Sequence, residues 1–176
     1  AAAERISLEE YFILISAFKV IKGGKDDARV LKLFFAKEGS HICCGGSTAH
    51  MISRYLNKPI IPVEDSGTDK VPAIATIEGM DLVTEGIITL QQVADLAEQY
   101  VSDNRLSITI NSGNDGVSLL CAYLFEQATD INFFFGKAEN TANDDLDIGM
   151  DAKAIVINRL ISSLREMGKN VKISRC

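Results

Sequence analysis

The sequence predicts an α/β domain of the Rossmann or flavodoxin type, with helices on both faces of a mostly parallel sheet of about five strands. Three observations lead to this prediction. Short continuous apolar runs, such as 11–15 and 131–135, are typical of strands buried on both faces. Stretches with apolar residues at helical spacing separate these runs. Strands that alternate with helices along a chain favour parallel pairing in three layers.

In the first half of the chain, each predicted element is an apolar pattern bounded by glycine, proline or a capping residue. Asp26 suits the N-terminus of the first helix, and Gly39 ends that helix. The expected elements are a strand at 11–15, a helix at 26–38, a strand at 41–44, a helix at 47–56, a loop at 60–70 and extended segments at 73–77 and 80–84.

The second half follows the same rules, and its helices are longer. Thr89 is a plausible cap for the first of them. Residues 108–116 fit a strand or a turn equally well. The other expected elements are a helix at 90–100, a buried helix at 117–128, a strand at 131–135, a loop at 137–149, a helix at 151–167 and an edge strand at 171–174.

Length and composition indicate one domain, 1–176, without a linker or an internal repeat. The chain has 176 residues, a net charge of -6 and 47% hydrophobic residues, which suffices for a core. Its basic residues form no cluster, which argues against nucleic acid, and no apolar run suggests a membrane segment. Four cysteines without a C-x-x-C motif, and two histidines at no zinc spacing, predict no metal and a reducing, cytoplasmic location.

The strongest local candidate for a functional site is the turn Gly45-Gly46-Ser47-Thr48, between a predicted strand and a predicted helix. Open α/β sheets bind ligands at this end of their strands. Glycines let a ligand approach the backbone, and the unpaired N–H groups of a first helical turn suit an anion. The structural alternative is a tight turn in which Ser47 or Thr48 caps the helix. The stretch matches neither the P-loop nor the dinucleotide fingerprint.

A second candidate is the segment 78–86, which carries Asp81, Thr84, Glu85 and Gly86. Its carboxylates are expected near a strand end, where they would hold a ribose hydroxyl or a metal-bound phosphate. The alternatives are a solvated acidic loop, or a carboxylate of Glu85 that caps backbone N–H groups.

The remaining clusters have structural explanations. The acidic run at 144–151 precedes or opens a helix, where carboxylates complement the helix dipole. His50 follows Ser47 by three residues and would face it on a helix, but nothing supplies the third member of a triad. Cys43 and Cys44 are interpreted as packing residues of a strand.

Three strings, at 43–49, 52–56 and 78–90, resemble the C-terminal region of bacterial SpoIIE-type serine/threonine protein phosphatases. In that region a C-G-G-S/T-T-A stretch precedes an I-E-G-x-D-L-V-T-E-G stretch, as it does here. The segment 131–140 is similar to the later strand, Gly, Asn segment of the family, which adds Asn140. The resemblance covers about Tyr11 to Arg175, and D-L-V-T-E-G is its most specific part.

In that family a preceding domain performs the phosphatase chemistry with a pair of Mg²⁺ or Mn²⁺ ions held by aspartates. Those aspartate motifs are absent here, and the sequence 25–28 is only a superficial echo of one of them. The resemblance therefore implies an accessory domain that has no catalytic residues and no cofactor of its own. The first residues, Ala1-Ala2-Ala3, lack a Met, which suggests a piece of a longer protein.

The expected function is a regulatory domain that binds a small anionic ligand, phosphate-bearing or a nucleotide, with the phosphatase domain or a second copy as further partners. The alternatives are a phosphoryl-handling enzyme that uses Ser47 and His50, and a dimerisation or docking module. The expected ligand-binding residues are Gly45, Gly46, Ser47, Thr48, Asp81, Thr84, Glu85, Gly86 and Asn140.

Overall fold

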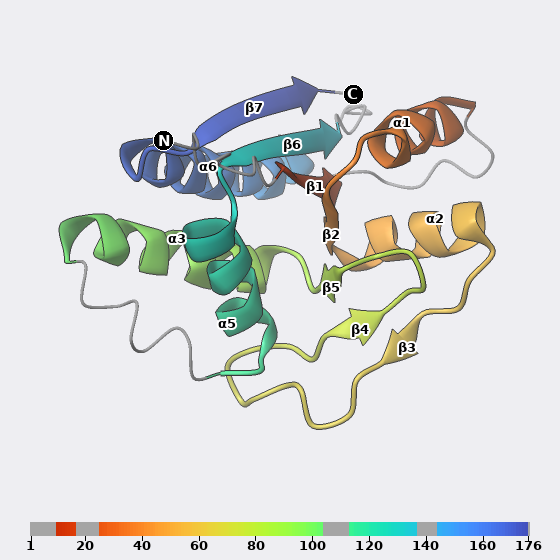
Figure 1. Ribbon diagram of the computed structural model, residues 1–176, viewed down its shortest axis with the longest axis horizontal. Coiled ribbons are helices and arrows are strands. Elements are labelled where there is room, and N and C mark those ends of the chain that lie inside the picture. The colour runs from red at the N-terminus through yellow and green to blue at the C-terminus, as the bar shows by residue number, and fades with distance from the viewer. Residues whose placement is uncertain (1–9, 17–24, 104–112, 137–143, 176) are drawn as a thin grey trace, which may run out of the picture.

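The computed structural model describes residues 10–16, 25–103, 113–136 and 144–175. These residues form both helices and strands, and the helices lie on both sides of one sheet (Figure 1). The predicted α/β class is therefore confirmed. Most of the segment 108–116, for which the sequence left strand and turn open, lies outside the described residues.

The described strands form one seven-stranded sheet in the order β3-β4-β5-β2-β1-β6-β7. The pairings along β5-β2-β1-β6-β7 are parallel, whereas β3 pairs with β4, and β4 with β5, in antiparallel fashion. The sheet is therefore mixed. The strands are β1 (Glu10–Ser16), β2 (Ser40–Cys44), β3 (Ile61–Pro62), β4 (Ala75–Thr76), β5 (Leu82–Thr84), β6 (Asp130–Gly136) and β7 (Asn170–Arg175).

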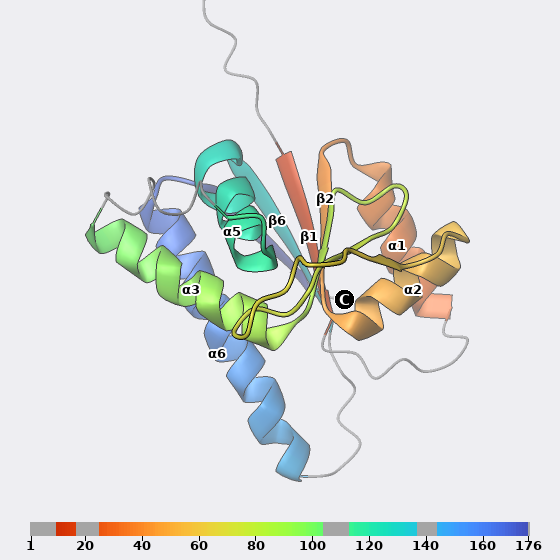
Figure 2. The same ribbon diagram turned by 90° about the horizontal axis from the view of Figure 1, so that it is seen from below.

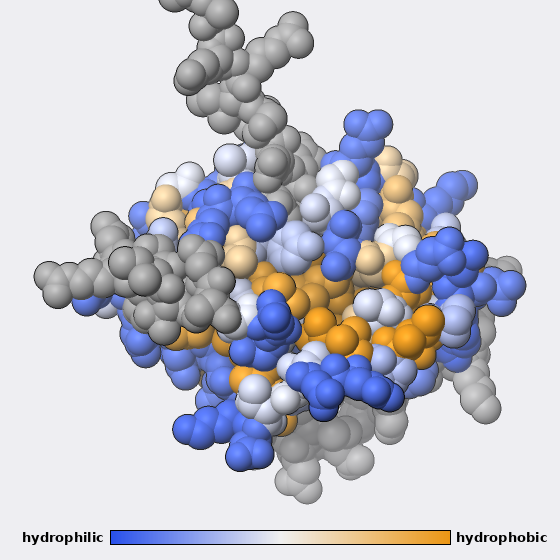
Figure 3. All heavy atoms as spheres, turned by 60° about the horizontal axis from the view of Figure 1, so that its bottom comes forward, coloured by the Kyte–Doolittle hydropathy of each residue, from blue (hydrophilic) through white to orange (hydrophobic). Residues whose placement is uncertain are grey.

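The edge strand β3 lies where the sequence predicted a loop. Two residues, one of them a proline, give no alternating pattern that a sequence could reveal. The connection to β4 is held by Ser66, whose buried hydroxyl donates to the carbonyl of Val63 and accepts the N–H of Ile74. The space-filling view, in which the β3 side of the molecule comes forward, shows apolar residues at its centre (Figure 3). Ile61 of β3 is exposed.

The helices form two layers. α1 (Lys25–Ala36) and α2 (Gly46–Leu56) cover one face of the sheet, and α3 (Ile87–Ser102), α5 (Gly116–Cys121) and α6 (Asp144–Glu166) cover the other (Figure 2). A π-helical segment, Ala122–Gln127, continues α5. α6 begins earlier than the predicted residue 151, so the acidic run lies inside the helix. No helix among the described residues has the length and apolar character needed to cross a membrane.

Each face of the sheet has its own core. Alternation along the strands sends Cys43 and Phe134 to the α1–α2 side, and Ile42 and Phe133 to the other. Cys43 and Cys44 belong to different cores, which confirms the prediction that they alternate in a strand. The largest fully buried side chains are Phe34, Phe133, Leu31, Ile42, Ile52, Ile77, Leu90 and Leu120.

β1 is the central strand of the parallel part of the sheet. The chain first adds β2 and β5 on one side of β1, and later β6 and β7 on the other. In sheets of this kind the direction of winding reverses between the two central strands, here β1 and β6. The segments that directly follow these strands, 17–24 and 137–143, lie outside the described residues.

Arg159 of α6 joins that helix to α3. Its Nη2 lies 2.6 Å from Asp95 Oδ1, and its Nε lies 2.7 Å from Glu98 Oε1. The hydrogen bond from Arg159 lowers the pKa of Glu98 from its ordinary value. Because the folded-state pKa is lowered, the stabilisation is present above the unfolded-state pKa and is lost as the pH falls below about 4.

We therefore expect Glu98→Gln to reduce stability at pH 7 and to reduce it by less at pH 3, because the pKa of Glu98 is lowered and protonation of its carboxyl removes the stabilisation as the pH falls. Urea unfolding of both proteins at the two pH values measures this difference. The control is Glu64→Gln, since Glu64 is exposed and forms no ion pair within the described part of the chain. An equal loss at both pH values would show that charge pairing with Arg159 contributes nothing.

Candidate functional site

Two turns meet at the carboxyl edge of the sheet, where β2 leads into α2 and β5 leads into α3. The N–H of Gly45 donates to the carbonyl of Thr84 over 3.0 Å. A Cβ on Gly86 would lie 3.6 Å from the Cα of Gly45. The two helices begin near each other at this edge and then diverge (Figure 2). We call residues 45–48 the α2 turn and residues 85–89 the α3 turn.

The two glycines of the α2 turn have different roles. Gly45 is the N-cap residue, with φ 136° and ψ 137°, a backbone conformation that glycine alone adopts easily. It provides no side-chain cap, so the structural alternative in which Ser47 or Thr48 caps the helix is wrong. Gly46 is exposed, and a Cβ there would meet nothing within 4 Å. The backbone at Gly46 is therefore accessible from solvent.

Thr48 has a buried hydroxyl without a partner. Its side chain is fully buried, and within the described residues its Oγ1 makes no hydrogen bond. A Cβ on Gly45 would lie 3.6 Å from this oxygen, which places the hydroxyl against the turn. A buried polar group that lacks a hydrogen bond costs about 1–3 kcal/mol. Ser47, by contrast, is exposed.

In the α3 turn, the threonine at the position equivalent to Thr48 has hydrogen-bond partners. Thr89 is the third residue after the glycine cap Gly86, as Thr48 is after Gly45, and both threonines are fully buried. The carboxylate of Glu85 accepts from the N–H of Thr89 over 3.1 Å, and its Oε2 lies 3.4 Å from the Thr89 hydroxyl. In the α2 turn the residue before the cap is Cys44, which has no carboxylate. The α3 turn thus has a carboxylate beside its buried threonine, and the α2 turn has a thiol side chain at the equivalent position.

Glu85 therefore positions α3 instead of facing a ligand, which is the capping role that the sequence left open as an alternative. Thr84 is buried, and its hydroxyl donates within its own turn, to the carbonyl of Glu85 over 2.9 Å. Gly86 packs against Gly45 and allows the close approach of the two turns. These three residues shape the site, and the α2 turn supplies its open donors.

Asp81 lies at the opposite end of β5, just before the strand begins. Its Oδ2 accepts from the N–H of His41 over 2.7 Å, and its own N–H donates to the carbonyl of His41. The intervening residues Leu82–Thr84 form β5, whose rise of about 3.3 Å per residue separates Asp81 from the α2 turn by roughly 10 Å. The expectation that Asp81, Thr84 and Glu85 gather at one strand end is therefore wrong. Asn140 lies outside the described residues.

The thiols beside the site are not nucleophiles. Burial raises the pKa of Cys44 to about 12, and burial together with the neighbouring Cys44 raises the pKa of Cys43 well above its ordinary value. Both thiols stay protonated at neutral pH, which agrees with a packing role. No hydrogen bond joins Ser47 to His50, which is exposed on α2. Within the described ranges, no three His, Cys, Asp or Glu side chains gather as a metal site.

Comparison with known proteins finds no matching family model, no matching curated protein and no matching solved structure. The resemblance to SpoIIE-type phosphatases therefore stays a prediction. The geometry of the two turns includes a feature that sequence reasoning missed. In both turns a threonine lies four residues after the residue that precedes the glycine cap, at 44–48 and at 85–89. The α3 turn has the carboxylate of Glu85 at the first of these positions, whereas the α2 turn has Cys44.

Proposed function

We propose that this chain is a ligand-binding domain that takes a small oxyanion-bearing ligand, a phosphate ester or a nucleotide, at the α2 turn. The observation that carries the proposal is the unpartnered, buried hydroxyl of Thr48. At the matching position of the α3 turn, a carboxylate engages both the N–H and the hydroxyl of Thr89. A ligand oxyanion at the α2 turn would supply the same two contacts to Thr48.

The rest of the turn supports a phosphate in this role. The N–H groups of Gly46, Ser47 and Thr48 precede Ala49, whose N–H makes the first backbone hydrogen bond of α2, to Gly45. Unpaired N–H groups and the helix dipole favour an anion at such an end. The exposed hydroxyl of Ser47 adds a donor at the rim. Gly46 is exposed, and a Cβ there would meet nothing within 4 Å, so the first turn of α2 is open to solvent at this point.

We also propose a finer fold class and a biological role for the chain. The parallel strands β5-β2-β1-β6-β7 support a Rossmann-type or flavodoxin-type arrangement, because such sheets wind outward from a central strand and bind ligands beyond the carboxyl ends of the strands. The α2 turn lies at that edge. The motif resemblance supports a regulatory domain of a SpoIIE-type serine/threonine phosphatase, which senses its ligand in the cytoplasm and transmits the signal to a catalytic domain.

The test pairs two variants that differ in one contact. Thr48→Val removes a hydroxyl without a partner, so we expect the unliganded protein to be as stable as the wild type, or more stable by up to about 1 kcal/mol. Thr89→Val removes a hydroxyl close to the Glu85 carboxylate, and we expect a loss of about 1 kcal/mol. Thermal unfolding of the three proteins against nucleotides, sugar phosphates and inorganic anions, with and without Mg²⁺, measures both stability and binding.

A ligand at one hundred times its dissociation constant stabilises the wild type by about 2.7 kcal/mol, which raises the midpoint by several degrees. We expect Thr48→Val to lose this shift and Thr89→Val to keep it. An equal shift in wild type and Thr48→Val would remove the α2 turn as the site. A flat screen of well-folded wild-type protein would contradict the proposal as a whole.

A further inference from the structure

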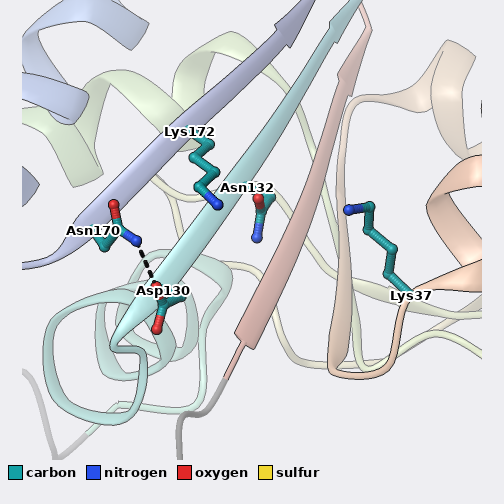
Figure 4. A pocket seen from close by; sticks show the side chains of 5 residues that line it. All are labelled: Lys37, Asp130, Asn132, Asn170 and Lys172. Carbon is teal, nitrogen blue, oxygen red and sulfur yellow. Dashed lines mark hydrogen bonds between the residues drawn. The ribbon is translucent and has the colours of Figure 1, made fainter.

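A second polar site lies on the sheet itself, on the face that α1 and α2 leave partly open. Of the described residues of β6 and β7, only Phe134 belongs to the core that these two helices cover. Towards the amino ends of the two strands, that face carries polar side chains in place of a core. A small hollow of about 60 Å³ opens there, lined by Lys37, Asp130, Asn132, Asn170 and Lys172 (Figure 4). We call it the polar hollow.

Three elements bring these residues together. Asn132 of β6 is in register with Lys172 of β7, so the two side chains are neighbours on one face. Lys37 follows α1 and reaches the hollow from the opposite side of β1 (Figure 4). The side-chain nitrogens of Lys172 and Lys37 lie on either side of the Asn132 amide (Figure 4). The hollow thus has two ammonium groups with an amide between them.

Asp130 is the one carboxylate among the described side chains that line the hollow, and both of its oxygens accept hydrogen bonds. Asp130 Oδ1 accepts from Asn170 Nδ2 over 2.7 Å, and Asp130 Oδ2 accepts from the hydroxyl of Thr129 over 3.2 Å. By contrast, neither the Asn132 amide nor the Lys172 ammonium group makes a hydrogen bond or an ion pair within the described residues. Asparagine is depleted in strands, and this one lies in an inner strand of the sheet. Among the described side chains that line the hollow, the Lys172 ammonium group and the Asn132 amide are therefore open to a ligand.

We propose that the polar hollow binds a compact oxyanion, a phosphate or carboxylate group, with the Lys172 ammonium group and the Asn132 amide as its donors. A charge-assisted hydrogen bond from an ammonium group, joined by an amide N–H, is the kind of interaction that such a group requires. The site is separate from the α2 turn, because its residues lie at the amino ends of β6 and β7 and the turn lies at the carboxyl end of β2.

The experiment is a titration with inorganic phosphate and, separately, with acetate, followed by the NMR signals of the Asn132 and Asn170 side-chain amides and of the backbone of β6 and β7. It is run on the wild-type chain and on Thr48→Val, so that phosphate bound at the α2 turn is recognised separately. We expect saturable shifts at the polar hollow in both proteins. Saturation by phosphate alone assigns a phosphoryl group, and saturation by both anions assigns oxyanions in general.

Three variants test the assignment. Lys172→Gln should weaken the affinity about tenfold, which corresponds to the loss of one charge-assisted contact. Asn132→Asp replaces a donor by a negative charge of the same shape and should abolish saturation. Lys70→Gln, at an exposed lysine of the 62–75 connection, is the matched control and should change the affinity less than twofold. Absence of saturable shifts at the hollow, or equal affinities for Lys172→Gln and Lys70→Gln, would overturn the proposal.

Discussion

Replacing Phe34 by alanine is expected to lower the free energy of unfolding by about 3–5 kcal/mol. The ring is fully buried on α1 and contacts Phe134 of β6 edge-on, with 5.5 Å between ring centroids. It also contacts the ring of His41, whose Nε2 lies 3.0 Å from the carbonyl oxygen of Phe34. Truncation removes apolar contact area and leaves a cavity between α1 and the sheet.

The control lies next to Phe34 on the same helix. Leu33 is 55% exposed, so Leu33→Ala loses little burial and should change stability by no more than about 0.5 kcal/mol. Urea unfolding of both variants gives the two values, and a constant dependence on denaturant would show that the unfolded states are comparable. A loss of under about 1 kcal/mol for Phe34→Ala would contradict the packing described for this face.

Gly45→Ala is expected to destabilise the protein by about 1–3 kcal/mol, because any other residue is strained at φ 136° and ψ 137°. Gly46→Ala, one position later, is expected to stabilise the protein instead. Gly46 is helical, and its added methyl would meet nothing within 4 Å. Reduced entropy of the unfolded chain should then raise stability by up to about 1 kcal/mol.

Thermal and urea unfolding of the two glycine variants measure this contrast. Strain at Gly45 would also distort the α2 turn, because the N–H of Gly45 holds the turn to the carbonyl of Thr84. Gly45→Ala should therefore weaken the ligand response, while Gly46→Ala keeps the fold and places a methyl at the rim. Equal stability of the two variants would show that the backbone of Gly45 relaxes at little cost.

Local sequence patterns predicted the main elements because buried positions recur with the period of the helix or strand. Continuous apolar runs marked β1 and β6, and the change of face between Cys43 and Cys44 followed from the two-residue period of a strand. β4 lies within the predicted extended segment 73–77, whereas the two-residue strand β3 left no such pattern. The start of α6 was missed because Gly149, which disfavours helix by about 1 kcal/mol, lies within a polar stretch.

The α2 turn was predictable because its chemistry is local: a strand, two glycines and the first turn of a helix. Asp81 was expected beside Thr84 and Glu85 because the segment 78–86 was predicted to lie around one strand end, but the strand β5 (Leu82–Thr84) separates Asp81 from the α3 turn. The unpartnered hydroxyl of Thr48 is a three-dimensional property, since it depends on what surrounds the side chain. The polar hollow joins residues 37, 130 and 170, whose separation in sequence hides their proximity.

The central place of β1 has a consequence for how the protein is made. Tyr11 is paired with Ser40 on one side and with Ile131 on the other. A ribosome that adds about 5–20 residues per second therefore delivers the second neighbour of β1 several seconds after the first. During that interval one side of β1 has unpaired backbone groups, a template for association with other chains. We therefore expect the nascent half-sheet β5-β2-β1 to be prone to association with other chains until β6 emerges.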